Sequence, residues 1–250
     1  MTSQDESAAV GVRPVETERR GAALVVRLNR PHRRNALDNE ALTALADALV
    51  EARRADARVV LLEGAGGTFC AGSDVKEMEA RGEAYRREHT RLGQDVFGRL
   101  ERAPALTIAL VDGYALGGGV ELAMACDVRL AVGESIWGFP EVTFGAIPAW
   151  GGTQRLPRFV GLGAAKRLLL TGERLPAREL VGLGLVDQVF DTREELEGAA
   201  AALAERAAEF PARPLSLIKE LTLASFDAPA ALGAWAERLV DEVGDSDLAL

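Results

Sequence analysis

The chain has 250 residues, of which 48% are hydrophobic and 27% are charged, and its formal net charge is −9. This length and composition are typical of a globular protein that buries a substantial core without disulfide bonds. The acidic balance argues against a surface dedicated to nucleic acid or to an anionic membrane, because both partners require a basic footprint.

The chain has two cysteines, Cys70 and Cys126, and two histidines, His32 and His89. They show no CxxC spacing and no clustering, so we expect no metal site. Two thiols in a large acidic chain fit a reducing compartment. The N-terminal stretch "MTSQDESAAVGVRP" lacks the apolar core of a signal peptide, and no apolar run reaches the length of about 18 residues that a membrane span needs. We therefore expect a cytoplasmic protein.

Apolar spacing predicts short strands that alternate with helices, and then helices alone. In chain order the expected elements are a strand at 23–29, a helix at 38–56, a strand at 58–65, a helix at 76–102, strands at 106–112 and 127–132, helices at 163–171 and 176–183, a strand at 186–190, and helices from 193 onward that end near 229–243. The segment 138–161 reads as mostly loop. This order predicts an α/β core over residues 21–192, after a flexible segment at 1–20 and before a helical region at 193–250.

A glycine turn interrupts the apolar stretch "GYALGGGVELAMACDVR" at residues 113–129. Gly117–Gly119 either allow tight packing of a helix against a sheet or let a ligand oxygen approach the backbone N–H groups. The turn alone does not decide between these interpretations. Glu121 follows in the first helical turn, where an acid either stabilises the helix dipole or serves a function. The apolar residues after it favour a buried and functional carboxylate.

A second glycine loop, "TFCAGSD", leads from a predicted strand into the helix at 76–102. Cys70 has no histidine motif that would supply a base, and Ser73 lies in no GxSxG elbow. We therefore interpret Cys70 as a small core residue. The loop can still supply a backbone N–H, and a second donor from Gly117–Gly119 would complete a two-point oxyanion hole.

A second acid, Glu141, follows a proline in the apolar stretch "GFPEVTFGAIP". It is either an exposed loop carboxylate or a partner of Glu121 in one small site. Two carboxylates that share a site do not both ionise easily, so the pKa of one rises and an acid and a base become available together.

Five motifs resemble, in their order and spacing, those of the crotonase superfamily, and the resemblance is closest to the enoyl-CoA hydratases. They are "NRPHRRNAL", "FCAGSDVKEM", "GYALGGGVELAMACDVR", "FPEVTFGAIPAWGGTQRLPR" and "LTGERLPARELVGLGLVDQV". The resemblance implies a crotonase-type spiral of ββα units, with a C-terminal helical region at 193–250 that builds homotrimers or hexamers. It also implies an acyl-CoA thioester substrate, with coenzyme A as part of that substrate and no separate cofactor.

The resemblance places the catalytic glutamates of the family on Glu121 and Glu141, and its oxyanion-hole amides on Ser73 and Gly118. The intact glutamate pair implies hydratase chemistry, in which Glu121 takes a proton from the water that attacks C3 and Glu141 delivers a proton to C2. The expected contacts with CoA and the acyl group are His32, Arg33, Arg34, Ala36, Ala71, Asp74, Val75, Lys76, Gly117, Ala149 and Trp150.

Trp150 departs from the small residues that relatives commonly carry in this loop, so we expect it to reshape the acyl pocket. Two alternatives to a hydratase share the resemblance: a Δ3,Δ2-enoyl-CoA isomerase, and a dehydratase of aromatic or secondary metabolism. A remote alternative is an RNA-binding relative, which the net charge of −9 disfavours.

Overall fold

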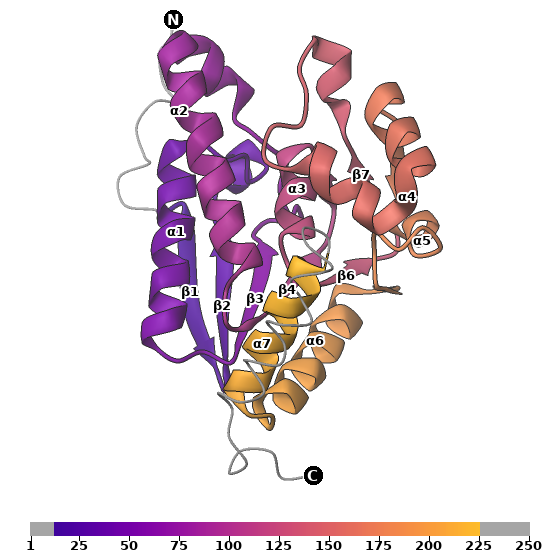
Figure 1. The fold of residues 1–250 in the computed structure, drawn as a ribbon. Helices are drawn as coiled ribbons and strands as arrows, with labels where there is room; N and C mark the ends of the chain where they lie inside the picture. The colour runs from indigo at the N-terminus through magenta and orange to yellow at the C-terminus, as the bar shows by residue number, and fades with distance from the viewer. Residues whose placement is uncertain (1–12, 226–250) are drawn as a thin grey trace, which may run out of the picture.

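A computed structural model describes residues 13–225 of the chain, and its centre is a six-stranded sheet (Figure 1). In spatial order the strands are β1 (Val15–Arg20), β2 (Ala23–Leu28), β3 (Val59–Gly64), β4 (Leu106–Val111), β6 (Val128–Val132) and β9 (Gln188–Phe190). The first pair, β1 and β2, is antiparallel, and every other neighbouring pair is parallel.

Helices cover both faces of this sheet. On one face α1 (Asn39–Arg54) packs with α2 (Val75–Glu101), and on the other lies α6 (Arg193–Ala208). Neighbouring residues of one strand enter different cores, because Leu62 of β3 lies in the cluster with α1 and Leu61 in the cluster with α6. Burial on both faces explains why these parallel strands are largely apolar rather than alternating.

A smaller sheet lies next to the glycine loops. It consists of β5 (Tyr114–Leu116), β7 (Ile136–Gly138) and β8 (Arg174–Pro176), with β7 in the centre. An isolated bridge between Cys70 and Ala115 ties β5 to the loop that precedes α2. These three-residue strands were not predicted, because they are too short to display an alternating pattern.

The structure confirms the predicted α/β class and corrects two assignments in the chain. Residues 15–20, expected to be flexible, form strand β1 at the edge of the sheet. The segment "VETERR" is polar because most of its side chains face solvent, as is usual for an edge strand. Part of the predicted loop at 138–161 belongs to α4 (Gly152–Thr171), whose glycines and Pro157 concealed the helix.

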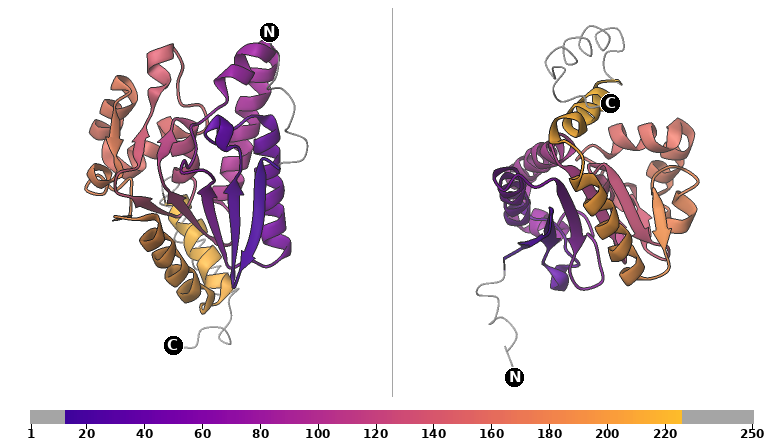
Figure 2. Two further views of the ribbon diagram at one scale, coloured as in Figure 1. Left: turned by 180° about the vertical axis from the view of Figure 1, so that it is seen from behind. Right: turned by 90° about the horizontal axis from the view of Figure 1, so that it is seen from below.

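The described part of the C-terminal region is helical, as expected. The short α5 (Ala177–Leu180) precedes β9, and α7 (Ala212–Ala224) follows α6 (Figure 2). Lys219 of α7 forms an ion pair of 2.7 Å with Asp127, which ties the helix to the core. The helix expected near 229–243 lies outside the described residues. Among residues 13–225 we find no helix with the length and hydropathy of a bilayer-crossing segment.

Candidate active site

The three glycines at 117–119 open α3 (Gly118–Met124), a helix in which every residue is buried. A Cβ on Gly119 would lie 2.1 Å from the carbonyl oxygen of Cys70, so this glycine permits tight packing. A Cβ on Gly117 would lie 2.4 Å from Oε1 of Glu141, and one on Gly118 would lie 2.4 Å from the indole of Trp150. Gly119 thus packs against the core, whereas Gly117 and Gly118 face candidate site residues.

The loop before α2 lies directly against this turn. Gly72 has a φ of +94°, and a Cβ there would lie 2.7 Å from the carbonyl oxygen of Leu116 and 3.1 Å from the nitrogen of Gly118. The turn and the loop thus bring Gly118 and Ser73 to one cavity. Within residues 13–225, neither of their backbone N–H groups has a hydrogen-bond acceptor. Two unengaged amides beside one cavity are the arrangement that an oxyanion hole requires.

Glu121 is a buried carboxylate, with 2% of its surface exposed. Its Oε1 accepts hydrogen bonds of 2.7 Å from the backbone N–H groups of Trp150 and Gly152. Burial raises the pKa of Glu121 to about 7, and the nearby Glu141 adds to the rise, while the two amides and Arg155 oppose it. A carboxyl group with this pKa exchanges protons readily near neutral pH.

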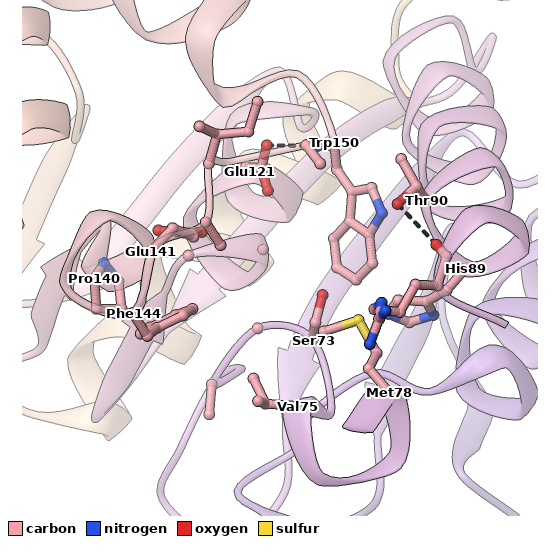
Figure 3. Close-up of a pocket in the computed structure, with 18 residues that line it drawn as sticks. Ser73, Val75, Met78, His89, Thr90, Glu121, Pro140, Glu141, Phe144 and Trp150 are labelled. Carbon is pink, nitrogen blue, oxygen red and sulfur yellow. Dashed lines mark hydrogen bonds between the residues drawn. The ribbon is translucent and has the colours of Figure 1, made fainter. Parts of the chain in front are cut away.

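The second carboxylate, Glu141, lies on a 3-10 helix, η2 (Pro140–Phe144). It is buried, so the interpretation as an exposed loop residue is excluded. Among residues 13–225 its buried Oε2 has no hydrogen-bond partner, and burial raises the pKa of the group. Glu121 and Glu141 line the same cavity, whose volume is about 230 Å³ (Figure 3).

The rest of the cavity wall is largely apolar, and much of it comes from α2 and the segment around η2. Sequence reasoning missed Gly72, Met78, Arg86, His89, Thr90, Pro140, Phe144, Ala146 and Ile147. One signal was available, because Arg86, His89 and Gly93 are spaced three and four residues apart and share a face of α2. His89 is buried, its Nδ1 pairs with Oδ1 of Asn39 at 2.7 Å, and burial lowers its pKa.

Trp150 is 3% exposed and occupies the space between α2 and α3. Its indole makes edge contacts with His89 and Phe97, at centroid distances of 4.9 and 5.1 Å. Trp150 and Ala149 line the cavity, as do Ala71, Val75 and Gly117 from the expected set of contacts.

The other expected contacts lie outside this cavity. His32, Arg33 and Arg34 are exposed on and after η1 (Pro31–Arg33), and the carbonyl of Arg34 accepts a 3.0 Å hydrogen bond from Ala71. This bond joins the basic segment to the loop that carries Ser73. Lys76 is exposed in the first turn of α2.

Two further expected contacts, Asp74 and Ala36, are buried and contribute to the fold. Asp74 caps α2 by accepting from the N–H of Glu77, and it forms an ion pair of 3.2 Å with Arg30. Ala36 belongs to the buried hydrophobic residues.

Cys70 is a buried core residue, as the sequence predicted. Burial raises the pKa of its thiol to about 12, so it is protonated at neutral pH and a poor nucleophile.

Comparison with known proteins identifies relatives along most of the chain. A family model described as "Enoyl-CoA hydratase/isomerase" matches residues 18–239. A short-chain-enoyl-CoA hydratase of Clostridium acetobutylicum is 42% identical over 180 residues, which are 71% of this chain and 69% of that protein. The human mitochondrial enoyl-CoA hydratase domain-containing protein 2 is 43% identical over 174 residues, which are 69% of this chain and 60% of the human protein. The matched region thus covers less than two thirds of the length of some relatives.

Solved structures match over nearly the whole chain. The crystal structure of an enoyl-CoA hydratase from Bacillus anthracis has a TM-score of 0.86 and 34% identity, and the match covers 93% of this chain and 92% of that one. An enoyl-CoA hydratase from Thermoplasma volcanium has a TM-score of 0.87 and 33% identity, with 94% of both chains covered.

Proposed function

Because the chain belongs to the enoyl-CoA hydratase/isomerase family, we propose that it is an enoyl-CoA hydratase, which adds water reversibly to a 2-enoyl-CoA thioester. The family match also confirms the resemblance that the five motifs indicate. One observation carries the proposed chemistry: two buried carboxylates, Glu121 and Glu141, share a cavity with the unengaged amides of Ser73 and Gly118.

The first step in the proposed mechanism is polarisation of the thioester. Its carbonyl oxygen accepts hydrogen bonds from the N–H groups of Ser73 and Gly118. When water adds to C3, the electron pair of the C2–C3 double bond moves toward the carbonyl, and an enolate oxygen forms. A donor aimed at such an oxygen contributes about 2.7–4 kcal/mol to the stability of the transition state in acyl-transfer enzymes.

The carboxylates then divide the proton transfers. Glu121, in its ionised form, takes a proton from the attacking water while the C3–O bond forms. Glu141, in its protonated form, donates a proton to C2 while the thioester carbonyl is restored. The product gains one H and one OH, and solvent returns the proton from Glu121 to Glu141. General acid–base steps of this kind each contribute about 10²–10⁴ in rate.

The hydrogen bonds around the two groups support this division of roles. Two N–H donors point at Oε1 of Glu121, and such donors favour the ionised form. In the part of the chain that the structure describes, Glu141 has no comparable donor at Oε2, so that buried oxygen can hold a proton. Burial raises the pKa of both groups, and the charge on Glu141 contributes to the value of about 7 for Glu121, so the pair shares one proton near neutral pH. We place that proton on Glu141 because the two amides favour the ionised form of Glu121.

We also propose that the basic segment and the start of α2 receive the phosphates of CoA. His32, Arg33, Arg34 and Lys76 are exposed, and the hydrogen bond from Ala71 to Arg34 holds the segment beside the Ser73 loop. The positive charges of Arg33, Arg34 and Lys76 complement a polyanionic nucleotide. The reaction as proposed uses the CoA of the substrate and no other cofactor.

The test is direct. Purified protein is mixed with crotonyl-CoA, and the loss of the conjugated enoyl absorbance is followed, with branched, cyclic and longer 2-enoyl-CoAs in parallel. Hydration of any of them supports the proposal, and inactivity with all of them overturns it. A 3-enoyl-CoA, whose conversion would produce the same absorbance, distinguishes the isomerase alternative.

Assembly and location belong to the same proposal. In line with the crotonase resemblance we propose a homotrimer or a pair of trimers, which light scattering after size-exclusion chromatography tests directly. We propose a cytoplasmic location because the two cysteines are free thiols and the chain is acidic. Detection of a disulfide in protein isolated from its native cell would contradict it.

A further inference from the structure

Two cavities meet at Trp150. The candidate active site has a volume of about 230 Å³, and a second and more open cavity of about 540 Å³ is lined mainly by α2, α4 and the segment between η2 and α4. Four residues line both of them: Thr90, Ile147, Ala149 and Trp150. These residues therefore form the partition between the catalytic carboxylates and the second cavity.

The indole of Trp150 fills this partition closely. A Cβ on Gly93 of α2 would lie 2.1 Å from the indole Nε1, and one on Gly118 would lie 2.4 Å from the opposite edge of the ring. The ring thus spans the distance between α2 and the oxyanion turn. Figure 3 shows it between Glu121 and the helix that carries His89 and Thr90.

The backbone on each side of the indole is fixed. The N–H of Trp150 donates a hydrogen bond to Oε1 of Glu121, and the carbonyl of Trp150 accepts one from Nη1 of Arg155. Each bond is 2.7 Å long. Gln94 of α2 donates a 2.8 Å hydrogen bond to the carbonyl of Ala149. The backbone of both residues is thus anchored, and the buried indole packs between His89 and Phe97.

The volume of the site cavity fits a short substrate. At about 30 Å³ per non-hydrogen atom, the volume that a water molecule takes in the liquid, 230 Å³ holds roughly eight such atoms. The four carbons, oxygen and sulfur of a crotonyl thioester and one water fit within this limit. An acyl chain of twelve carbons exceeds this volume.

Building on the proposed function, we propose that Trp150 sets the acyl-chain length by closing the active site toward the second cavity. The substrates are then 2-enoyl thioesters with short acyl chains. Removal of the indole joins the two cavities and gives a longer chain a path along α2 and α4.

The experiment compares kcat/KM for 2-enoyl-CoAs of four, eight and twelve carbons in the wild type, Trp150→Ala and Trp150→Leu. We expect the wild type to favour four carbons, and the Ala variant to raise the twelve-to-four ratio by about 10- to 200-fold, the discrimination that a hydrophobic pocket reaches for one methylene. Trp150→Leu keeps more apolar volume than Trp150→Ala. If the Ala variant does not fold, the twelve-to-four ratio is measured in the Leu variant instead. Trp137→Phe is the control for loss of a buried tryptophan that lines neither cavity.

Calorimetric binding of butyryl-CoA and dodecanoyl-CoA separates this proposal from the proposed function. If the wild type hydrates nothing but binds butyryl-CoA far better than dodecanoyl-CoA, and the Trp150 variants lose this preference, the function is wrong and the role of Trp150 stands. A wild type that accepts twelve carbons as readily as four overturns the role of Trp150. An unchanged preference in both folded variants also overturns it.

Discussion

The backbone N–H of Trp150 donates a 2.7 Å hydrogen bond to Oε1 of Glu121, while the indole of Trp150 forms a wall of the same cavity. One residue thus holds a candidate catalytic carboxylate with its main chain and shapes the acyl site with its side chain. The two contributions are separable, because any residue other than proline at position 150 keeps the donor. Substitutions of the indole therefore leave the hydrogen bond to Glu121 available.

Glu141→Gln tests the proposed proton donor. The amide keeps the size of the side chain but delivers no proton to C2, so we expect kcat for crotonyl-CoA hydration to fall by about 10²–10⁴-fold. Binding of CoA thioesters stays close to that of the wild type, because Arg33, Arg34 and Lys76 are unchanged. Steady-state kinetics and calorimetry measure the two quantities. Glu88→Gln, on the exposed face of α2, is the matched control, and unchanged turnover in Glu141→Gln removes Glu141 from the mechanism.

The pKa of Glu121 predicts how activity depends on pH. Glu121 acts as a base only when ionised, and its pKa is about 7, so kcat/KM rises as the pH is raised through that value. Glu141 acts only when protonated, and burial raises its pKa, so loss of its proton lowers activity as the pH rises. The rising and falling parts of the pH–rate profile report pKa values of the coupled pair rather than of one residue. A pH–rate profile that is flat between pH 5 and pH 9 contradicts this reading of the site.

The same pKa predicts a conflict between activity and stability. The pKa of Glu121 is about 7 in the folded protein and near 4.5 in the unfolded chain, so the folded protein binds this proton more tightly. The stabilisation of the fold that results is fully present below pH 4.5. It is lost as the pH rises through about 7, at a cost of about 3 kcal/mol in the free energy of unfolding. Glu121→Gln is therefore expected to be inactive and yet more stable relative to the wild type at pH 8 than at pH 5. Urea titrations at the two pH values measure this difference, and an equal difference at both is the contrary result.

The fold class followed from the sequence because long apolar strands and amphipathic helices have clear periods. The elements that were missed show no clear hydrophobic period. Strands β5, β7 and β8 have three residues each, and α4 contains glycines and a proline. The candidate carboxylates and amides were predicted from motifs. The resemblance also implies that the helix at 76–102 borders the acyl pocket, but the residues of α2 that line it were not predicted. His89 and Gly93 lie in a polar helix whose inner face only the packing of Trp150 reveals.

Tight packing at the glycine turn leads to a prediction about stability. A Cβ on Gly119 would meet the carbonyl oxygen of Cys70 at 2.1 Å, a contact with backbone that cannot move aside easily. Gly119→Ala is therefore expected to lower the free energy of unfolding by about 1–3 kcal/mol, as overpacking of a core does. Gly198 is an exposed residue inside α6, and a Cβ there would have no described atom within 4 Å, so Gly198→Ala is expected to stabilise the protein by about 0.4–1 kcal/mol. Equal stability of the two variants in urea titrations would contradict the packing argument.

The proposed phosphate contacts make the last prediction, which separates binding of the nucleotide from catalysis. Lys76→Ala removes an exposed cation without touching the cavity, so we expect KM for crotonyl-CoA to rise while kcat stays near the wild-type value. The effect shrinks at high salt, because exposed charges are screened. Crotonyl-N-acetylcysteamine carries the same thioester without the nucleotide, so its kinetics are expected to be identical in wild type and variant. A KM that rises equally for both thioesters would instead mean that Lys76 supports the Ser73 loop, since loss of that support affects every thioester.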